Sequence, residues 1–200
     1  MTAKEMEQFR EYPGKIRNLA VSLRRNGIPA EISQEILEGG QSVNPRDREE
    51  MTHWFKAAMT RMDWLLGDEL CHAVREGCAC CLTGKRQALA RQIYRENDTL
   101  ESRLEALGQA TYIIGHSARM EEDGNIWVRF ADKVENASCP CMKVEETPMP
   151  VSYCYCCGGH IKHHLETALG VKTSCRTVSS LLSSGGKQPC IFSFTILTKK

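Results

Sequence analysis

The pattern that most constrains the fold lies between residues 51 and 66. Apolar side chains recur there at steps of three and one, which is the spacing of one face of an α-helix. The sequence therefore predicts a long amphipathic helix. Its methionines and tryptophan could line a ligand pocket, but a packed core is the favoured interpretation, because unbranched methionine fills irregular core gaps. The stripe consists of Met51, Trp54, Phe55, Ala58, Met59, Met62, Leu65 and Leu66.

Helical signals also fill the rest of the first 110 residues. The apolar residues of segment 16–23 lie on one helical face, which Gly27 closes, and Pro29 opens a shorter helix. We expect Asn44 to cap the 51–66 helix, with Pro45 in its first turn. Further helices are predicted over residues 68–76, 85–97 and 100–107.

The periodicity changes in the C-terminal part of the chain. Alternating residues over 126–130 follow Asp123-Gly124, a pair typical of a hairpin turn. A helix is predicted from about Gly159 to Leu169, closing at Gly170, and a last strand over 191–197.

These signals together predict an α+β fold. A helical N-terminal half packs on a C-terminal antiparallel sheet with a cysteine-rich helix. Residues 1–110 form the helical region and residues 111–200 the α+β region, and the two regions can share one core.

Charge and hydropathy argue against two kinds of partner. The formal net charge of +1 over 200 residues gives no electrostatic footprint for nucleic acid. No apolar run approaches the roughly 20 residues that a membrane-spanning helix needs. The first eight residues include the charged Lys4, Glu5 and Glu7 and contain no apolar signal-peptide stretch. We therefore expect a cytoplasmic protein that binds neither nucleic acid nor membrane.

Eleven cysteines are the outlying feature of the composition. In a reducing compartment, clustered thiols bind metal or do redox work more often than they form structural disulfides. Three isolated cysteines (Cys71, Cys175 and Cys190) are expected to be small buried apolar residues. The predicted metal-site residues are Cys78, Cys80, Cys81, Cys139, Cys141, Cys154, Cys156, Cys157 and His160.

Zinc is the expected cofactor, because it takes four soft ligands in a tetrahedron, commonly from two short ligand pairs. Cys139 and Cys141 would form one pair, and Cys154 with Cys156 or Cys157 the other. A metal bridging these loops would stabilise the fold as well as serve the site. Four thiolates suit an iron–sulfur cluster equally well, so this cofactor stays open.

A catalytic alternative centres on Cys157. Gly158-Gly159 is expected to leave free N–H groups at a helix start, where they would stabilise a thiolate. His160, three residues on, could then act as the base of a small-molecule hydrolase or a thiol redox enzyme. The same spacing would let Cys157 and His160 approach one metal ion.

The last fifty residues carry a resemblance. The Cys154–Gly159 stretch, a helix ending in Gly170 and the run Gly185-Gly186-Lys187-Gln188-Pro189-Cys190-Ile191-Phe192-Ser193-Phe194 resemble the end of 4-vinyl-reductase-like small-ligand-binding domains. They are also similar to bacterial proteins labelled aminothiazoline-carboxylate-hydrolase-like. The resemblance implies an antiparallel α+β fold, a small-molecule ligand or metal-sensing role, and a bacterial cysteine-rich family. It transfers no catalytic residues, and a homodimer stays open.

Overall fold

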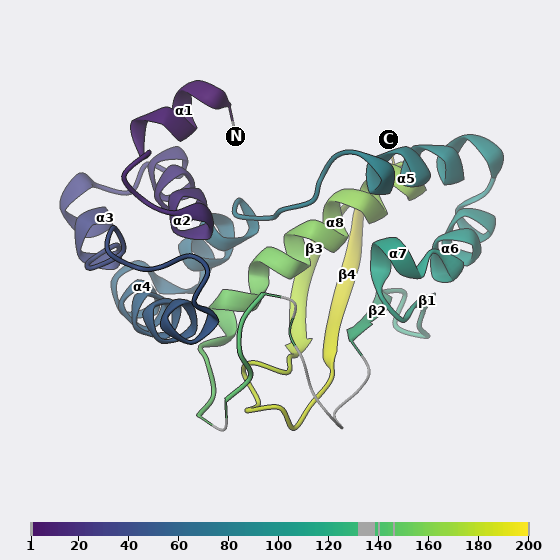
Figure 1. Cartoon of the computed structure of the whole chain (residues 1–200). Helices are drawn as coiled ribbons and strands as arrows, with labels where there is room; N and C mark the ends of the chain where they lie inside the picture. Colours follow the sequence, from purple (N-terminus) through teal and green to yellow (C-terminus); the bar gives the residue numbers. More distant parts are fainter. Residues whose placement is uncertain (1, 132–138, 140, 146, 200) are drawn as a thin grey trace.

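The computed structural model describes residues 2–131, 139, 141–145 and 147–199. The chain folds into a helical half and a half in which helices cover a sheet (Figure 1). The predicted α+β class is therefore confirmed. Within the described residues, no helix is both long and apolar enough to cross a membrane. The helices of the first half are α1 (Ala3–Gln8), α2 (Gly14–Arg25), α3 (Ala30–Ile36) and α4 (Arg48–Glu76).

The predicted apolar stripe lies on α4, which contacts α2, α3 and the later helix α8. Asp47 caps α4, since its Oδ1 accepts from the backbone N–H groups of Glu49 and Glu50 at 2.9 and 3.1 Å. The expected cap at Asn44 is therefore wrong: this side chain accepts from the Arg46 N–H in the preceding turn. The predicted 51–66 and 68–76 helices both lie within α4. They are separated there by a kink at Gly67, whose φ is 71°.

The second half begins with three helices, α5 (Lys85–Glu96), α6 (Leu100–Gln109) and α7 (Thr111–Ile114). The strands β1 (Ser117–Met120), β2 (Ile126–Ala131), β3 (Val171–Ser179) and β4 (Cys190–Lys199) form one sheet in the order β1-β2-β4-β3. Every neighbouring pair is antiparallel, and β1 and β2 form the hairpin that Asp123-Gly124 predicts.

Helix α8 (Tyr155–Leu169) follows a 3-10 helix (Val151–Cys154) and lies across the sheet (Figure 1). Alternation puts the apolar residues of β2 and β4 on one face, with Ile126 opposite Phe194 and Val128 opposite Phe192. These side chains are buried with Ile161 and Leu165 of α8.

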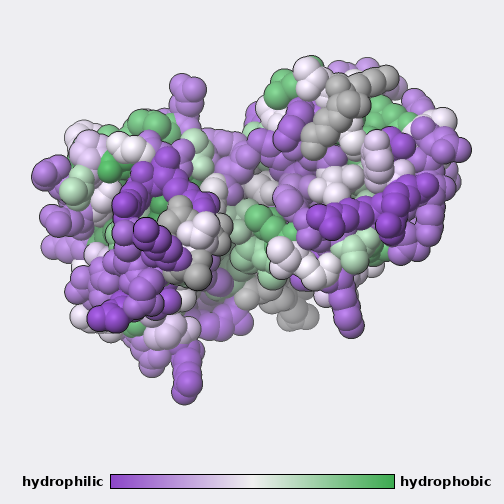
Figure 2. Space-filling view, turned by 90° about the horizontal axis from the view of Figure 1, so that it is seen from above, coloured by the Kyte–Doolittle hydropathy of each residue, from purple (hydrophilic) through white to green (hydrophobic). Residues whose placement is uncertain are grey.

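Buried residues form two hydrophobic cores. The α4 core draws on α2, α3, α4, the 3-10 helix and later loops, and it includes Leu19, Ile36, Phe55, Met59, Met62, Met142, Met149 and Tyr153. The sheet core includes Ile93, Leu107, Ile114, Ile126, Val128, Ile161, Leu165, Phe192 and Phe194. In the view from above, two lobes with largely hydrophilic surfaces flank a hydrophobic patch (Figure 2).

The lobes meet where α4 ends against the start of α8. A Cβ at Gly159 would lie 2.7 Å from the Glu76 carbonyl oxygen, so only glycine fits there without a shift. Lys162 Nζ also reaches Glu76 Oε1 at 2.6 Å. Helix α8 therefore belongs to the junction as well as to the sheet half.

Candidate thiolate centre

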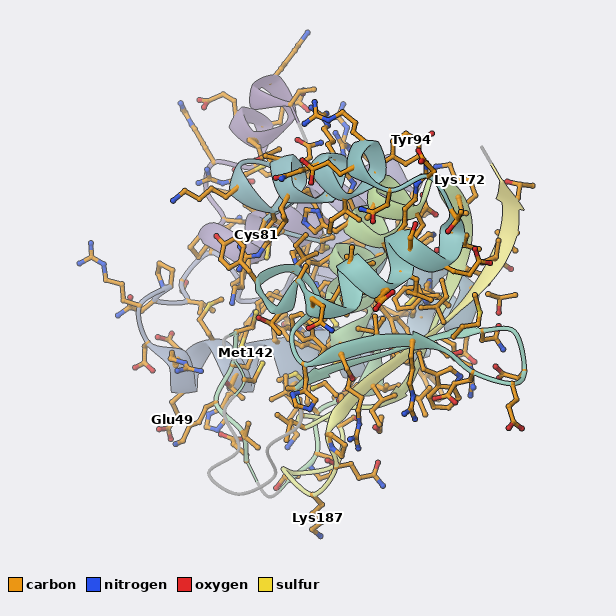
Figure 3. All side chains as sticks on the ribbon, turned by 90° about the vertical axis from the view of Figure 1, so that its right-hand side faces the viewer. Glu49, Cys81, Tyr94, Met142, Lys172 and Lys187 are labelled. Carbon is orange, nitrogen blue, oxygen red and sulfur yellow. The ribbon has the colours of Figure 1, made fainter. Side chains whose placement is uncertain are left out.

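The first cysteine cluster lies on the loop between α4 and α5. Cys78 is buried, whereas Cys80 and Cys81 are exposed. Cys81 has φ 59°, the left-handed region that side-chain-bearing residues rarely adopt, and it is alone in this among the non-glycine residues described. Figure 3 labels Cys81 just before α5. A strained backbone persists only where its surroundings hold it.

Two histidines of α8 hold this loop. His160 Nδ1 lies 2.8 Å from the Cys80 carbonyl oxygen, and His164 Nε2 lies 3.0 Å from that of Cys81. A carbonyl oxygen only accepts, so each of these ring nitrogens carries a hydrogen. Burial lowers the pKa of His160 and lowers that of His164 to about 4, so both rings are neutral at pH 7. The pair fixes the position of the first cysteine cluster.

The third cluster spans the 3-10 helix and the first turn of α8. Cys154 is buried and its thiol donates to Ser180 Oγ at 3.2 Å, while Cys156 donates to the Tyr153 carbonyl oxygen at 3.3 Å. The helix begins at Tyr155, so the expected helix start at Gly158-Gly159 is wrong. These glycines lie inside α8, where their small size permits close approach of α4 and β3.

The second cluster is attached to the N-terminal helices. Lys15 Nζ donates to the Cys141 carbonyl oxygen at 3.0 Å. Arg48 Nη2 donates to the carbonyl oxygens of Cys139 and Met142 at 2.6 and 2.9 Å. The Cys141 N–H donates to the Cys139 thiol sulfur at 3.4 Å. Side chains of α2 and α4 therefore bring a segment from the second half of the chain into contact with the first.

Arg75, from the last turn of α4, lies at the centre of these segments. Its exposed fraction is only 3%, and Nη2 donates to the Tyr153 carbonyl oxygen at 2.9 Å. The guanidinium stacks over the Tyr153 ring, 4.8 Å from the centroid. Burial opposes its charge, but the charges of Cys156 and Cys78 outweigh this and raise the Arg75 pKa. Within the described residues, no carboxylate forms an ion pair with it.

Two of the thiols have lowered pKa values. A hydrogen bond from the Cys157 thiol and the charge of Arg75 lower the pKa of Cys156 to about 7 against the effect of burial. A hydrogen bond from Cys139 and the charge of Lys15 lower that of Cys141 to about 6. The donors Cys139 and Cys157 have raised pKa values. The arrangement is two cysteines of lowered pKa, each with a thiol donor and a nearby cation.

The structure thus brings together most, but not all, of the predicted site residues. The charges of Cys141 and Cys156 raise the pKa of the Cys80 thiol. The charge of Cys156 also raises the pKa values of Cys78, Cys154 and Cys157. Cys81 adjoins Cys80 at the surface. The ring of His160 is hydrogen-bonded to the Cys80 carbonyl oxygen.

Three residues of this region were not predicted. Arg75 continues the face of Cys71, Val74 and Cys78, so a lone arginine within an apolar helical face was the available signal. Lys15 carries no comparable signal. Cys190 lines a cavity of about 30 Å³ with Cys139, Cys154 and Cys157, and only the sheet register brings it there.

Within the described part of the chain, no group of three or more His, Cys, Asp or Glu side chains is arranged to hold a metal ion. The thiols share one neighbourhood but do not converge on one point.

Comparisons with known proteins add a family but no activity. Neither the curated proteins nor the solved structures give a match. A family model matches residues 15–200, almost the whole chain. The chain belongs to a family of unknown function, DUF6144.

Proposed function

We propose that this chain binds a soft metal ion, with zinc expected, through the thiolates of Cys141 and Cys156 and thiols beside them. The observation that carries the proposal is the meeting of three cysteine-bearing segments around the buried Arg75. A buried cation without a carboxylate partner needs another negative charge nearby. Thiolates on a metal ion supply that charge, because four of them on Zn²⁺ leave a net negative centre.

Cys141 and Cys156 are the first two ligands of the proposal, because the thiolate is the metal-binding form of cysteine. Cys139 and Cys157, which are half-buried beside them, are the candidates for the remaining positions. Their side chains would have to rotate toward a common point, since none of the described groups is arranged around an ion. His160 is left out of this set because its ring is hydrogen-bonded to the Cys80 backbone.

A small ligand and a reducing compartment belong to the same proposal. An open position on the metal would admit a ligand or water, whereas four protein ligands would make the centre structural. The cytoplasm fits a centre of free thiols because its reductants keep cysteines reduced. All eleven cysteines are free in the structure.

The test is elemental analysis and a visible spectrum of protein purified without oxygen. We expect stoichiometric zinc and a colourless protein. Cys156→Ser should lose the metal, whereas the matched control Cys175→Ser should keep it, because Cys175 lies under α8 with Glu76 and Lys162 as its charged neighbours. Iron in the protein, together with visible absorption, would indicate that the cofactor is an iron–sulfur cluster and not zinc. Metal-free protein with unchanged thermal stability would contradict the proposal.

A second candidate is thiol–disulfide exchange, which the Cys139–Cys141 pair favours specifically. The Cys141 thiolate would attack a substrate disulfide, forming a mixed disulfide and releasing one substrate thiolate. Cys139 would then lose its proton and attack the Cys141 sulfur, releasing the second thiolate and leaving a Cys139–Cys141 disulfide. The substrate takes up the two electrons. Reduction of a chromogenic disulfide by metal-free protein, lost in Cys141→Ser, would support this candidate.

A further inference from the structure

The loop that carries Cys80 and Cys81 has features that a permanent, buried metal-ligating cysteine would not need. Of the eleven cysteines, these two are exposed, while Cys139, Cys141 and Cys156 are half-buried. Exposure therefore falls step by step from the loop toward the centre. A metal ion arriving from solvent meets Cys80 and Cys81 first.

The loop is also held in place more firmly than an ordinary surface turn. Each of its two exposed cysteines has its carbonyl oxygen bound by a histidine of α8, and Cys81 is held at a positive φ. Strain of this kind costs about 1–2 kcal/mol, so the surrounding contacts offset it. The result is a pair of adjacent thiols kept at a fixed place on the surface.

The inner side of the pair adjoins the inner thiols. Cys78, two residues before Cys80, is buried in the α4 core, and Cys139, Cys141 and Cys156 pack against the same core. A cation held at Cys80 is therefore attracted toward the two thiolates that would bind it more tightly.

From this arrangement we infer that Cys80 and Cys81 form an entry port, which passes a soft divalent metal ion from solvent to the inner thiolates by ligand exchange. The inference rests on the proposed function, because it requires metal at the centre. It adds a kinetic role for two residues that the final site does not need.

The transfer changes no oxidation state, since Zn²⁺ has no redox chemistry. At the port, a bond from zinc to its chelator breaks as a bond to the Cys80 sulfur forms, and the thiol proton goes to solvent. In the next step the Cys141 or Cys156 thiolate binds zinc as the Cys80 bond breaks. Cys80 then takes a proton back from solvent.

The experiment follows zinc transfer from a chromophoric chelator to reduced, metal-free protein by stopped-flow absorbance. The double variant Cys80→Ser/Cys81→Ser should load roughly tenfold more slowly than wild type, equivalent to about 1.4 kcal/mol in the barrier. Release to a strong competing chelator should slow by the same factor, so the final stoichiometry and affinity should not change. The control Cys175→Ser should load at the wild-type rate.

Three outcomes would overturn the port. An unchanged loading rate would show that zinc enters elsewhere. A loss of stoichiometry or affinity in the double variant would make Cys80 and Cys81 permanent ligands. Failure of the wild-type protein to take up zinc would contradict both the proposed function and the port. This outcome is distinct from the first two, in which the wild-type protein binds zinc and only the double variant decides.

Discussion

The two hydrophobic cores differ in the chemistry of their side chains. The sheet core is built from Ile, Leu, Val and Phe, with Cys157, Cys175 and Cys190 only partly buried at its edge. The α4 core contains buried methionines, buried cysteines and, beside them, a buried arginine. An apolar core needs no buried charge for its stability, and a lone one is costly. The comparison therefore favours the α4 core as the neighbour of the proposed metal centre, and packing as the main role of the sheet core.

The strongest test of this contrast is Arg75→Met. If a metal–thiolate centre surrounds the guanidinium, the variant should lose about 3–5 kcal/mol in the free energy of unfolding of the metal-loaded protein, because its thiolates lose their buried counter-charge. Urea denaturation with and without metal measures the loss. Arg103→Met is the matched control, because Arg103 stacks on Tyr94 at 4.0 Å outside the centre and should cost about 1 kcal/mol. A neutral or stabilising Arg75→Met would show that no negative centre is present.

The sheet core should respond to truncation alone. Leu165 is fully buried in it, so Leu165→Ala should cost about 3 kcal/mol through lost burial and a cavity. The loss should be the same in metal-loaded and metal-free protein, measured by urea denaturation of both forms. A loss that depends on metal would mean that the two cores share the centre, and the contrast would fail.

The junction between the cores is tested by Gly159→Ala. The added Cβ would meet the Glu76 carbonyl oxygen at 2.7 Å and Glu76 Cγ at 2.8 Å. We expect a loss of about 2 kcal/mol, since α8 must move away from α4. Gly124→Ala is the control: a Cβ there meets nothing within 4 Å, and only its φ of 76° is strained, at about 1 kcal/mol. Equal thermal shifts for the two variants would show that the junction tolerates movement.

The smallest effect concerns thiol reactivity in reduced, metal-free protein. Iodoacetamide at pH 7 should alkylate half-buried Cys141 before exposed Cys80, because the Cys141 pKa is about 6 and that of Cys80, raised by desolvation on its inner side and by Cys81, is about 11. Peptide mass spectrometry gives the order. Faster labelling of Cys80 would show that exposure, and not charge, governs these thiols.

The same pKa values fix the sign of the pH dependence. The folded pKa values of Cys141 and Cys156 are below their ordinary value of 9.0, so their contribution to stability is present above pH 9 and is lost as pH falls through about 7 and 6. The raised pKa values of Cys139 and Cys157 change the stability only above pH 9, so they do not alter the pH dependence below that value. Stability of the metal-free protein should therefore rise between pH 6 and pH 9.

The fold was predictable where periodicity is strong. The α4 stripe, the Asp123-Gly124 hairpin and the close of α8 at Gly170 each follow from a local rule. The errors lie where a tertiary contact decides. Asp47 and Asn44 are both good caps, and only the course of the chain selects Asp47. Gly158-Gly159 suggested a helix start, but they serve the close packing around Glu76 and Cys175.

The site was predictable only as a set of residue types. Clustered cysteines indicated thiol or metal chemistry, but the sequence does not show that Cys156, and not Cys157, carries the lowered pKa. The hydrogen bond between the two thiols contributes most to that difference, and the charge of Arg75, 81 positions before Cys156 in the chain, lowers the Cys156 pKa further. Likewise the hydrogen bond from His160 to Cys80 joins segments that no local pattern relates.

Lys15 and Arg48 hold the backbone of Cys139, Cys141 and Met142 against the N-terminal helices. Met142, Met149 and Tyr153, which follow β2 in the chain, are interior residues of the α4 core. A fragment ending near residue 110 would therefore leave Phe55 and Met59 bare to water. Such a fragment would be prone to aggregate, so the N-terminal half of this polypeptide depends on the C-terminal half for its solubility.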